Sequence, residues 1–158
     1  MGRSQTIFLL VCFSVLFLFD RTSSRSDDFS MVEPYFVSID KQKAHLREGP
    51  AFRYPIRLVY VRKGVPLKVD AKYDHWRRVE DVSGNKGWMH KRVLTSQTKT
   101  FVTIREGKIY QKPTLNSTLV AQVSPKVYGI IKKCKKFWCK VKIDDLSGWM
   151  MKESFWGS

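Results

Sequence analysis

The stretch at residues 76–90, WRRVEDVSGNKGWMH, begins with tryptophan, continues as an alternating charged strand, turns at residues 83–85 and closes on Gly-Trp. Residues 138–151, WCKVKIDDLSGWMM, follow the same plan with an acidic turn, and Val79 of the first copy corresponds to Val141 of the second. The two tryptophans are twelve residues apart in the first copy and eleven in the second, so the two turns differ by one residue. This internal repeat predicts that the chain folds as two copies of one small unit.

The chain is strongly basic, and its charge is divided evenly between the two copies. Its 158 residues include 29 Lys and Arg against 14 Asp and Glu, a formal net charge of +15, with 43% hydrophobic and 27% charged residues. Residues 37–94 carry 14 basic and 6 acidic side chains, and residues 99–158 carry 12 and 4, which is +8 in each. This composition is typical of an ordered protein and favours a polyanionic partner such as cell wall, an acidic lipid surface or nucleic acid.

The first 24 residues have the pattern of a secretory signal peptide. Residues 7–19 are apolar apart from Ser14, a length that suits the central region of a signal and is short for a membrane span. Small residues at 22–24 offer a cleavage region, and the alternatives are an uncleaved anchor or a buried helix. We therefore predict a periplasmic or secreted protein with no membrane span once the signal is removed, and a flexible lead-in over residues 25–34.

The remaining chain predicts an all-β protein made of two tandem small antiparallel barrels, preceded by the signal-peptide helix. About five short strands per unit, separated by frequent turns, favour a bent antiparallel barrel over a parallel βαβ architecture. We place the first barrel at residues 35–95, a linker at 96–100 and the second barrel at 101–158. Lys91 to Leu94 is expected to form one helical turn.

Three segments of the first copy resemble the bacterial SH3-like domain family (SH3b). Residues 44–50, AHLREGP, are similar to the family's V-N-V-R-x-G-P opening, and residues 76–79 and 87–90 are similar to its W-x-R-V and G-W-V-H strands. Two departures are the His-Leu pair at 45–46 in place of Asn-Val, and residues 109–113, IYQKP, where the second copy keeps only the proline of R-x-G-P.

The tandem as a whole is similar to a group of secreted SH3-like proteins of alphaproteobacterial type. The matching segments are YPI at residues 54–56, WRR at 76–78, the Cys…W-C hairpin at 134–139 and FWG at 155–157. This resemblance covers about residues 35–158. It implies a barrel that binds cell-wall or protein ligands and has no catalytic activity of its own.

Cys134 and Cys139 are expected to form a structural disulfide in an exported protein. If they lie on the two arms of a hairpin, their Cα atoms would be about 4.5–5.5 Å apart, which a disulfide can bridge. The alternative, a redox switch or a nucleophile, would need a base nearby, and all three histidines belong to the first copy. The spacing does not match a C-x-x-C redox site, no second pair exists for zinc, and Cys12 lies within the apolar run.

Aromatic side chains among basic residues are the main candidates for ligand binding. Trp88 and Trp149 follow glycine at the start of a strand and are expected in the core. The expected groove residues lie at turns or strand edges: Tyr54, Tyr73, Trp76, Arg77, Phe137 and Trp138. Aromatic-lined grooves of this kind hold extended peptides.

A run of lysines surrounds the cysteine hairpin. These are Lys132, Lys133, Lys135, Lys136, Lys140 and Lys142. One interpretation is a solvated edge that prevents strand-to-strand aggregation, and the other is a patch that docks an anion. The sequence supports both equally.

The leading hypothesis is an exported, non-enzymatic binding module of the cell envelope that engages peptidoglycan peptide or another anionic extended ligand. The alternative is a secreted interaction protein that binds another protein or nucleic acid, although no nucleic-acid-binding motif is present. A cell-wall hydrolase is less favoured, because it would need a Cys/His or zinc constellation. We expect no cofactor and no metal, and the oligomeric state is left open.

Overall fold

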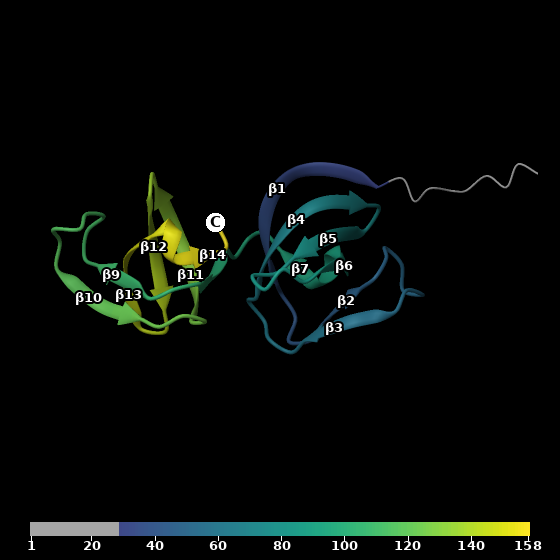
Figure 1. Ribbon diagram of the computed structural model, residues 1–158, viewed down its shortest axis with the longest axis horizontal. Helices are drawn as coiled ribbons and strands as arrows, with labels where there is room; N and C mark the ends of the chain where they lie inside the picture. The colour runs from purple at the N-terminus through teal and green to yellow at the C-terminus, as the bar shows by residue number, and fades with distance from the viewer. Residues whose placement is uncertain (1–28) are drawn as a thin grey trace, which may run out of the picture.

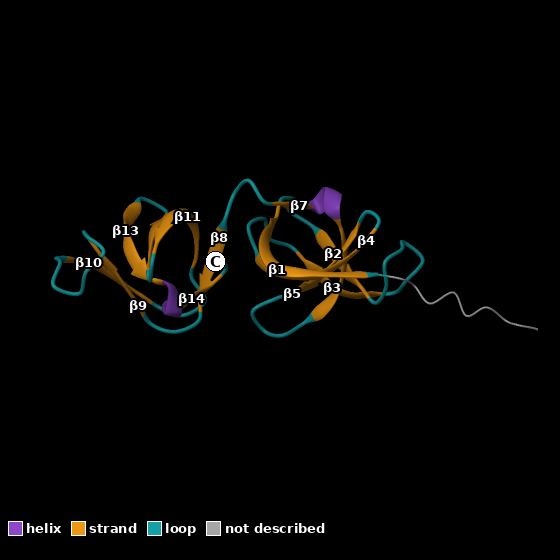
Figure 2. Ribbon diagram, turned by 90° about the horizontal axis from the view of Figure 1, so that it is seen from above, coloured by secondary structure: helices purple, strands orange, loops and turns teal. Residues whose placement is uncertain are grey.

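The computed structural model describes residues 29–158, which form two antiparallel β-sheets joined by a short connection (Figure 1). The expected all-β class is confirmed, and the helical segments in this part of the chain are two 3-10 turns, η1 (Lys91–Val93) and η2 (Lys152–Ser154) (Figure 2). The predicted signal peptide at residues 1–24 lies outside the described residues. Between residues 29 and 158, no helix is long and apolar enough to cross a membrane.

Seven strands make up each sheet, and we call residues 30–95 the first unit and 100–157 the second unit. The strands of the first unit are β1 (Ser30–Ile39), β2 (Ala44–Arg47), β3 (Ile56–Tyr60), β4 (Pro66–Tyr73), β5 (Trp76–Glu80), β6 (Lys86–His90) and β7 (Leu94–Thr95). Those of the second are β8 (Thr100–Thr103), β9 (Gly107–Tyr110), β10 (Leu119–Val123), β11 (Tyr128–Lys135), β12 (Trp138–Ile143), β13 (Leu146–Met151) and β14 (Phe155–Trp156).

The two sheets share one topology. The strand order is β3-β2-β6-β5-β4-β1-β7 in the first unit and β10-β9-β13-β12-β11-β8-β14 in the second. Each strand of the second sheet therefore takes the place of the strand seven positions earlier in the chain. The repeat in the sequence is a repeat of the whole fold, and residues can be matched between the units by register.

The strands extend further than the sequence pattern predicts. Residues 30–34, expected to belong to a flexible lead-in, are part of β1, where Ser30 pairs with Lys72 and Met31 with Ala71 of β4. Backbone pairing to β4 orders this segment although most of its side chains are exposed, so it carries no clear apolar alternation. At the other end of the unit, Thr100 belongs to β8 and the connection is residues 96–99.

Each sheet encloses its own apolar core. The first contains Leu67, Val69 and Met89, and the second contains Phe101 and Ile109, all at or below 1% exposure. The repeat-matched Val79 and Val141 are 1% and 0% exposed. Full burial of an aliphatic side chain contributes about 1.5–3 kcal/mol, so these positions stabilise each unit separately.

The glycine of the Gly-Trp pair that ends each copy is required because a side chain at its position would clash with the neighbouring strand. A methyl group on Gly87 would lie 2.6 Å from the carbonyl oxygen of Arg47 and 2.8 Å from Cγ of Leu46. A methyl group on Gly148 would lie 2.7 Å from the carbonyl oxygen of Tyr110, the residue that matches Arg47. Glycine thus lets β2 approach its neighbour β6 closely in the sheet, and β9 approach β13.

Direct contacts join the two units. The buried hydroxyls of Ser38 and Thr100 lie 2.7 Å apart, and Ser38 Oγ also donates to the Thr98 carbonyl at 2.8 Å. The rings of Phe36 and Trp156 meet edge to face at 5.2 Å. Figures 1 and 2 both place the C-terminus at this junction. The units are therefore packed against one another as well as covalently linked.

Asp81 organises the turn between β5 and β6. Its carboxylate accepts hydrogen bonds from the Ser83 and Asn85 backbone N–H groups, from the Asn85 amide and from the Tyr60 hydroxyl at 2.7 Å. Burial opposes its ionisation, but the hydrogen bonds from Asn85, Tyr60 and Ser83 outweigh burial and lower the pKa of Asp81. Burial together with the bond to Asp81 raises the pKa of Tyr60. The second copy replaces this arrangement with a shorter turn at Asp144 and Asp145.

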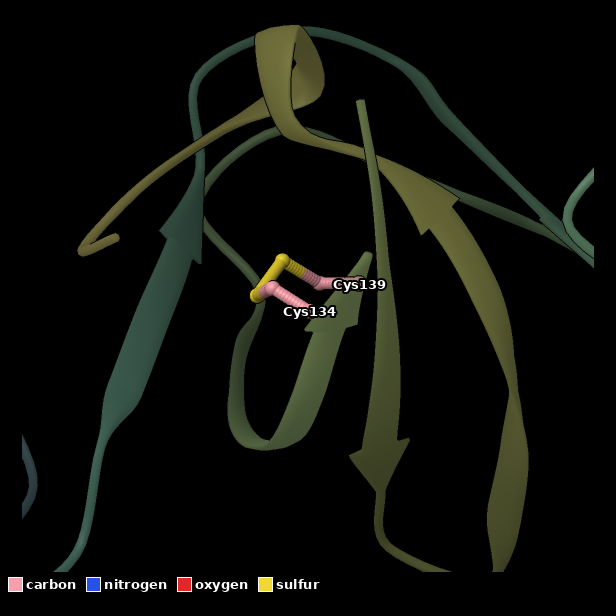
Figure 3. The surroundings of a disulfide bond; sticks show 2 residues. All are labelled: Cys134 and Cys139. Atoms are coloured by element: carbon pink, nitrogen blue, oxygen red, sulfur yellow. A yellow bond between two sulfur atoms is a disulfide. The ribbon is translucent and has the colours of Figure 1, made fainter. Parts of the chain in front are cut away.

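The predicted disulfide between Cys134 and Cys139 is confirmed, and Figure 3 shows it joining the two arms of the β11–β12 hairpin. The Cα atoms are 4.0 Å apart, closer than the predicted 4.5–5.5 Å. Lys135 pairs with Trp138, so the turn contains only Lys136 and Phe137. Cys139 is fully buried in the second core and Cys134 is exposed.

Replacing Asp81 with alanine should lower the free energy of unfolding by about 1–3 kcal/mol, because it leaves a half-buried hydroxyl and two turn N–H groups without their acceptor. Asp145→Ala, in the exposed turn of the second copy, is the control and should change it by less than about 0.5 kcal/mol. Because the pKa of Asp81 is lowered on folding, its contribution is complete above its ordinary value of 3.8 and is lost as the pH falls below it. Urea unfolding at several pH values measures this, and equal effects of the two variants would contradict it.

The double variant Cys134→Ser/Cys139→Ala should lose about 2 kcal/mol from a closed loop of this length. For a unit of about 60 residues this corresponds to a fall of roughly 10 °C in melting temperature, seen in the second unit and much less in the first. Calorimetry measures the shift. Thiol titration of the denatured, unreduced protein should find no reactive cysteine at these positions, and two free thiols would contradict the disulfide.

Candidate ligand-binding site

A small cleft on the first unit gathers aromatic, histidine and basic side chains. It has a volume of about 220 Å³ and is bounded by β2, the β2–β3 loop, the start of β5 and the end of β6 with η1. We call it the first groove. Its lining residues include Arg47, Phe52, Trp76, His90 and Arg92.

Three rings form the floor of the first groove. The Phe52 and Trp76 centroids are 5.0 Å apart, and Phe52 stacks on His90 at 5.5 Å with an interplanar angle of 19°. Trp76 meets His90 edge to face at 5.3 Å. Trp76 is only 6% exposed whereas Phe52 is 56% exposed, so Trp76 supports the cluster and Phe52 presents an apolar ring to solvent.

The two arginines of the groove have different roles. Arg47 Nη1 donates to the carbonyl oxygens of Phe52 and Tyr54 at 3.0 and 2.8 Å, which holds the β2–β3 loop in place. The Arg92 guanidinium lies 5.2 Å from the centre of the Phe52 ring. Within residues 29–158 it makes no ion pair and donates no hydrogen bond. Its N–H groups are available to an anionic group in the groove.

His90 lies among positive charges. Burial, followed by Arg92, His75 and Lys91, lowers the pKa of His90, against a smaller opposing effect of Asp74. The His75 ring is 5.8 Å away, and His90 Nδ1 accepts a hydrogen bond from the Arg92 backbone N–H at 3.2 Å. The imidazole is therefore neutral near pH 7 and becomes a further cation in the groove only at acidic pH.

The groove residues expected from the sequence do not form one site. Trp76 lies in the first groove, but Tyr73 packs behind it and Arg77 donates to the Asp74 and Trp76 carbonyls of its own turn. Tyr54 lines a separate cleft of about 210 Å³ together with Phe29 and Trp88.

In the second unit, Phe137 is 74% exposed at the tip of the β11–β12 turn. Trp138 contacts Tyr110 edge to face at 5.6 Å. The expected core positions also differ, because Trp88 is buried while Trp149 is only half-buried, with the Lys133 amine 5.9 Å from its ring. A tryptophan after glycine is thus in the core in one copy only.

Gly49 of the R-x-G-P segment is required by Tyr54. A methyl group on Gly49 would lie 2.6 Å from the Tyr54 ring. The β9–β10 loop has the same length and the same turn hydrogen bonds, and there Lys112 replaces Gly49 and Ser117 replaces Tyr54. The Lys112 backbone N–H donates to Ser117 Oγ at 2.9 Å. Without the ring, the second copy has no need of the glycine, which explains the lost motif.

The matching groove of the second unit has a different charge. Register pairs Arg47 with Tyr110, because both face the tryptophan of the Gly-Trp pair. By the same register the second groove has Glu106 for Lys43, Leu115 for Phe52, Met151 for His90 and Glu153 for Arg92. It has a volume of about 390 Å³. The two grooves therefore share a scaffold but differ in ring content, and the second has Glu106 and Glu153 where the first has cations, although Lys108 also lines it.

The lysines of the predicted basic patch all lie on the β11–β12 hairpin. Lys132, Lys133, Lys135, Lys136 and Lys142 are exposed, and Lys140 is half-buried. Among residues 29–158, no group of three or more His, Cys, Asp or Glu residues is arranged to hold a metal ion.

Phe52, His90 and Arg92 were not predicted as groove residues. His75 and His90 are in contact, at 5.8 Å between their ring centroids. The signal that was available is the aromatic residue in the loop after R-x-G-P, together with the basic residues that follow the Gly-Trp strand. These positions come from separate strands, and only folding brings them together.

Comparison with known proteins identifies a family. The bacterial SH3 domain family matches residues 40–95 and again residues 105–157. No curated protein sequence matches the chain.

The chain is also similar to several solved structures. NlpC2 and NlpC1 of Trichomonas vaginalis each give a TM-score of 0.38, at 11% and 12% identity over 82% of this chain. A protein described as an autolysin from Listeria monocytogenes gives 0.33, at 14% identity over 82% of this chain. The chain spans 50%, 48% and 64% of these proteins, respectively. All three TM-scores lie below 0.5, so these likenesses carry no functional argument.

The NMR titration midpoint of His90 should lie below its ordinary value of 6.5, because burial and the nearby cations disfavour the imidazolium. The unfolded chain then binds the proton first as the pH falls, so the free energy of unfolding declines below pH 6.5 and is unaffected by His90 above it. His90→Gln should remove this part of the decline, and His45→Gln, the control, should leave it in place. A midpoint at or above 6.5 would contradict the arrangement.

Proposed function

The chain belongs to the bacterial SH3 domain family, and we propose that it is a non-catalytic binding protein of the cell envelope. Its ligand in this proposal is the peptide of peptidoglycan, or an anionic extended peptide of similar chemistry, held in the first groove. The exposed Phe52 ring on the Trp76–His90 floor, with Arg92 above it, is the observation that carries the proposal.

The family and the disulfide together indicate a protein that functions outside the cytoplasm. We extend this to export by residues 1–24 as a signal peptide, to a periplasmic or secreted location, and to membership of the secreted alphaproteobacterial type. The boundaries of the two domains at residues 35–95 and 101–158 belong to the same proposal. These finer points rest on the sequence patterns described above.

The chemistry of the first groove suits a peptide that ends in, or carries, a carboxylate. Within residues 29–158 the side-chain N–H donors of Arg92 are uncommitted and lie beside an exposed ring, and Lys43 adds a second positive charge on the wall. Guanidinium binds carboxylate through paired N–H donors, and a ring surface accepts the apolar part of a peptide. A cleft of about 220 Å³ is smaller than a typical ligand pocket and suits one residue of a chain.

The second groove is less suited to this ligand. Glu153 replaces Arg92 and Glu106 replaces Lys43, and carboxylates at these places repel an anionic peptide. Leu115 offers no ring where Phe52 does. We therefore assign peptide binding to the first unit and treat the second unit as a differently specialised copy.

Phe52→Ala and Arg92→Glu should each weaken binding to soluble peptidoglycan fragments by about tenfold or more, as expected for a central aromatic or arginine contact. Leu115→Ala is the matched control, because Leu115 occupies the position of Phe52 in the second unit. Calorimetry with purified fragments, and pull-down with sacculi beside DNA-cellulose at equal salt, measure the effect.

Unchanged affinity in both first-groove variants would overturn the assignment. An equal loss in Leu115→Ala would show that binding is not confined to the first groove and would overturn its assignment to the first unit. Stronger retention on DNA-cellulose than on sacculi would support instead a secreted protein that binds nucleic acid.

A further inference from the structure

A third cleft lies where the two units meet, and we call it the junction cleft. It has a volume of about 450 Å³ and is lined by both units. The first unit contributes Arg62 and Lys63 from the β3–β4 loop, and the second contributes Tyr128, Lys132 and Lys142 from β11 and β12. Neither unit alone forms it.

Positive charge dominates this cleft. Four of its lining side chains are cations, and Asp144 is the only acidic lining residue among residues 29–158. Cations gathered in a partly enclosed space repel one another, and a bound anion relieves that repulsion. The composition therefore favours an anionic occupant.

Three of the four cations are not committed to a carboxylate. Lys63 is bound to Asp40 at 3.0 Å, but in the described part of the chain no ion pair or hydrogen bond engages the side chains of Lys132 and Lys142. The Arg62 guanidinium carbon lies 4.1 Å from the centre of the Tyr128 ring. This stacking covers one face of the guanidinium and leaves the N–H donors on its edge for a ligand.

The walls of the cleft are held in place by the contacts between the units. Tyr128 packs against the core of the first unit, and the Ser38–Thr100 hydrogen bond lies beside the cleft. Lys142 pairs with Ile130 across the β11–β12 hairpin, and Lys132 lies at the register shift between Ile131 and Lys133 on β11. Both lysines line the cleft, so this part of the hairpin faces the first unit.

We propose that the junction cleft binds a polyanion through two or more of its phosphate groups. Phosphate oxygens accept hydrogen bonds both from separate lysine amines and from a guanidinium fork, so neighbouring phosphate groups match the two kinds of donor in the cleft. The cleft is large enough for more than one phosphate group. A phosphodiester polymer and a polyphosphate chain share this chemistry.

This site is separate from the first groove, since the two share no lining residue. Peptide binding by the first unit and phosphate binding at the junction can therefore be lost independently. A protein with ligands in both the first groove and the junction cleft would hold a peptide and a phosphate-containing polymer at the same time.

Inorganic tripolyphosphate is the probe, titrated calorimetrically into the full chain. Lys132→Glu/Lys142→Glu should weaken its binding by about tenfold or more, because two positive charges at the ligand become negative. Amide shifts measured by NMR on tripolyphosphate addition should centre on residues 98–100 and 128–132.

Lys133→Glu/Lys140→Glu is the matched control. These two lysines face each other on the same hairpin, change the net charge by the same amount and do not line the cleft. The control should retain affinity within about threefold, since charges farther from the ligand are screened by salt. Phe52→Ala should bind tripolyphosphate normally.

Equal losses in the two double variants would overturn the proposal, because they would show attraction to net charge alone. Absence of binding by the unaltered chain would also overturn it. Citrate, a tricarboxylate, is the comparison ligand, and affinity for citrate equal to that for tripolyphosphate would exclude a phosphate-specific site. Melting curves establish that each variant is folded, as expected for substitutions of lysines at the surface.

Discussion

The rest of the structure depends on the close approach of two paired strands at a glycine in each unit. At Gly87 and Gly148 there is no room for a side chain, so β2 pairs closely with β6 and β9 pairs closely with β13. An eight-residue loop follows β2 and another follows β9. Phe52 is thereby brought against Trp76, and Leu115 into the matching place in the second unit. The glycine thus determines where a groove forms, and the neighbouring side chains determine what it binds.

Duplication of such a unit lets its two grooves diverge without loss of the fold. The residues that stabilise the fold are of the same type in both copies. Examples are Val79 and Val141 in the two cores, and the glycines where the paired strands approach closely. The residues at the groove rim differ, with Arg92 in one copy and Glu153 in the other. Rim residues contribute little to burial, so they can change at small cost in stability.

Packing of the two units creates a surface that neither contains. Trp156 at the end of the chain lies against Phe36 and has the Lys68 amine 5.1 Å from its ring, while Tyr128 packs on the core of the first unit. The Trp156 indole N–H is buried and has no hydrogen-bond partner within residues 29–158, so its contribution at the junction is apolar packing. These contacts place Arg62 opposite the lysines of β11 and β12.

The sequence by itself determined the features that depend on neighbours along the chain. The repeat, the all-β class and the Cys134–Cys139 pair all follow from short-range patterns, since strand alternation and a hairpin bond involve residues a few positions apart. Only the tertiary structure decided which aromatic residues are buried and which residues share a groove. Trp88 and Trp149 both stand in a Gly-Trp-Met sequence, but Trp88 is buried and Trp149 is half-buried, because their exposure depends on strands from elsewhere in each unit. Phe52, His90 and Arg92 meet because β2 pairs with β6, and that pairing joins residues that no local pattern connects.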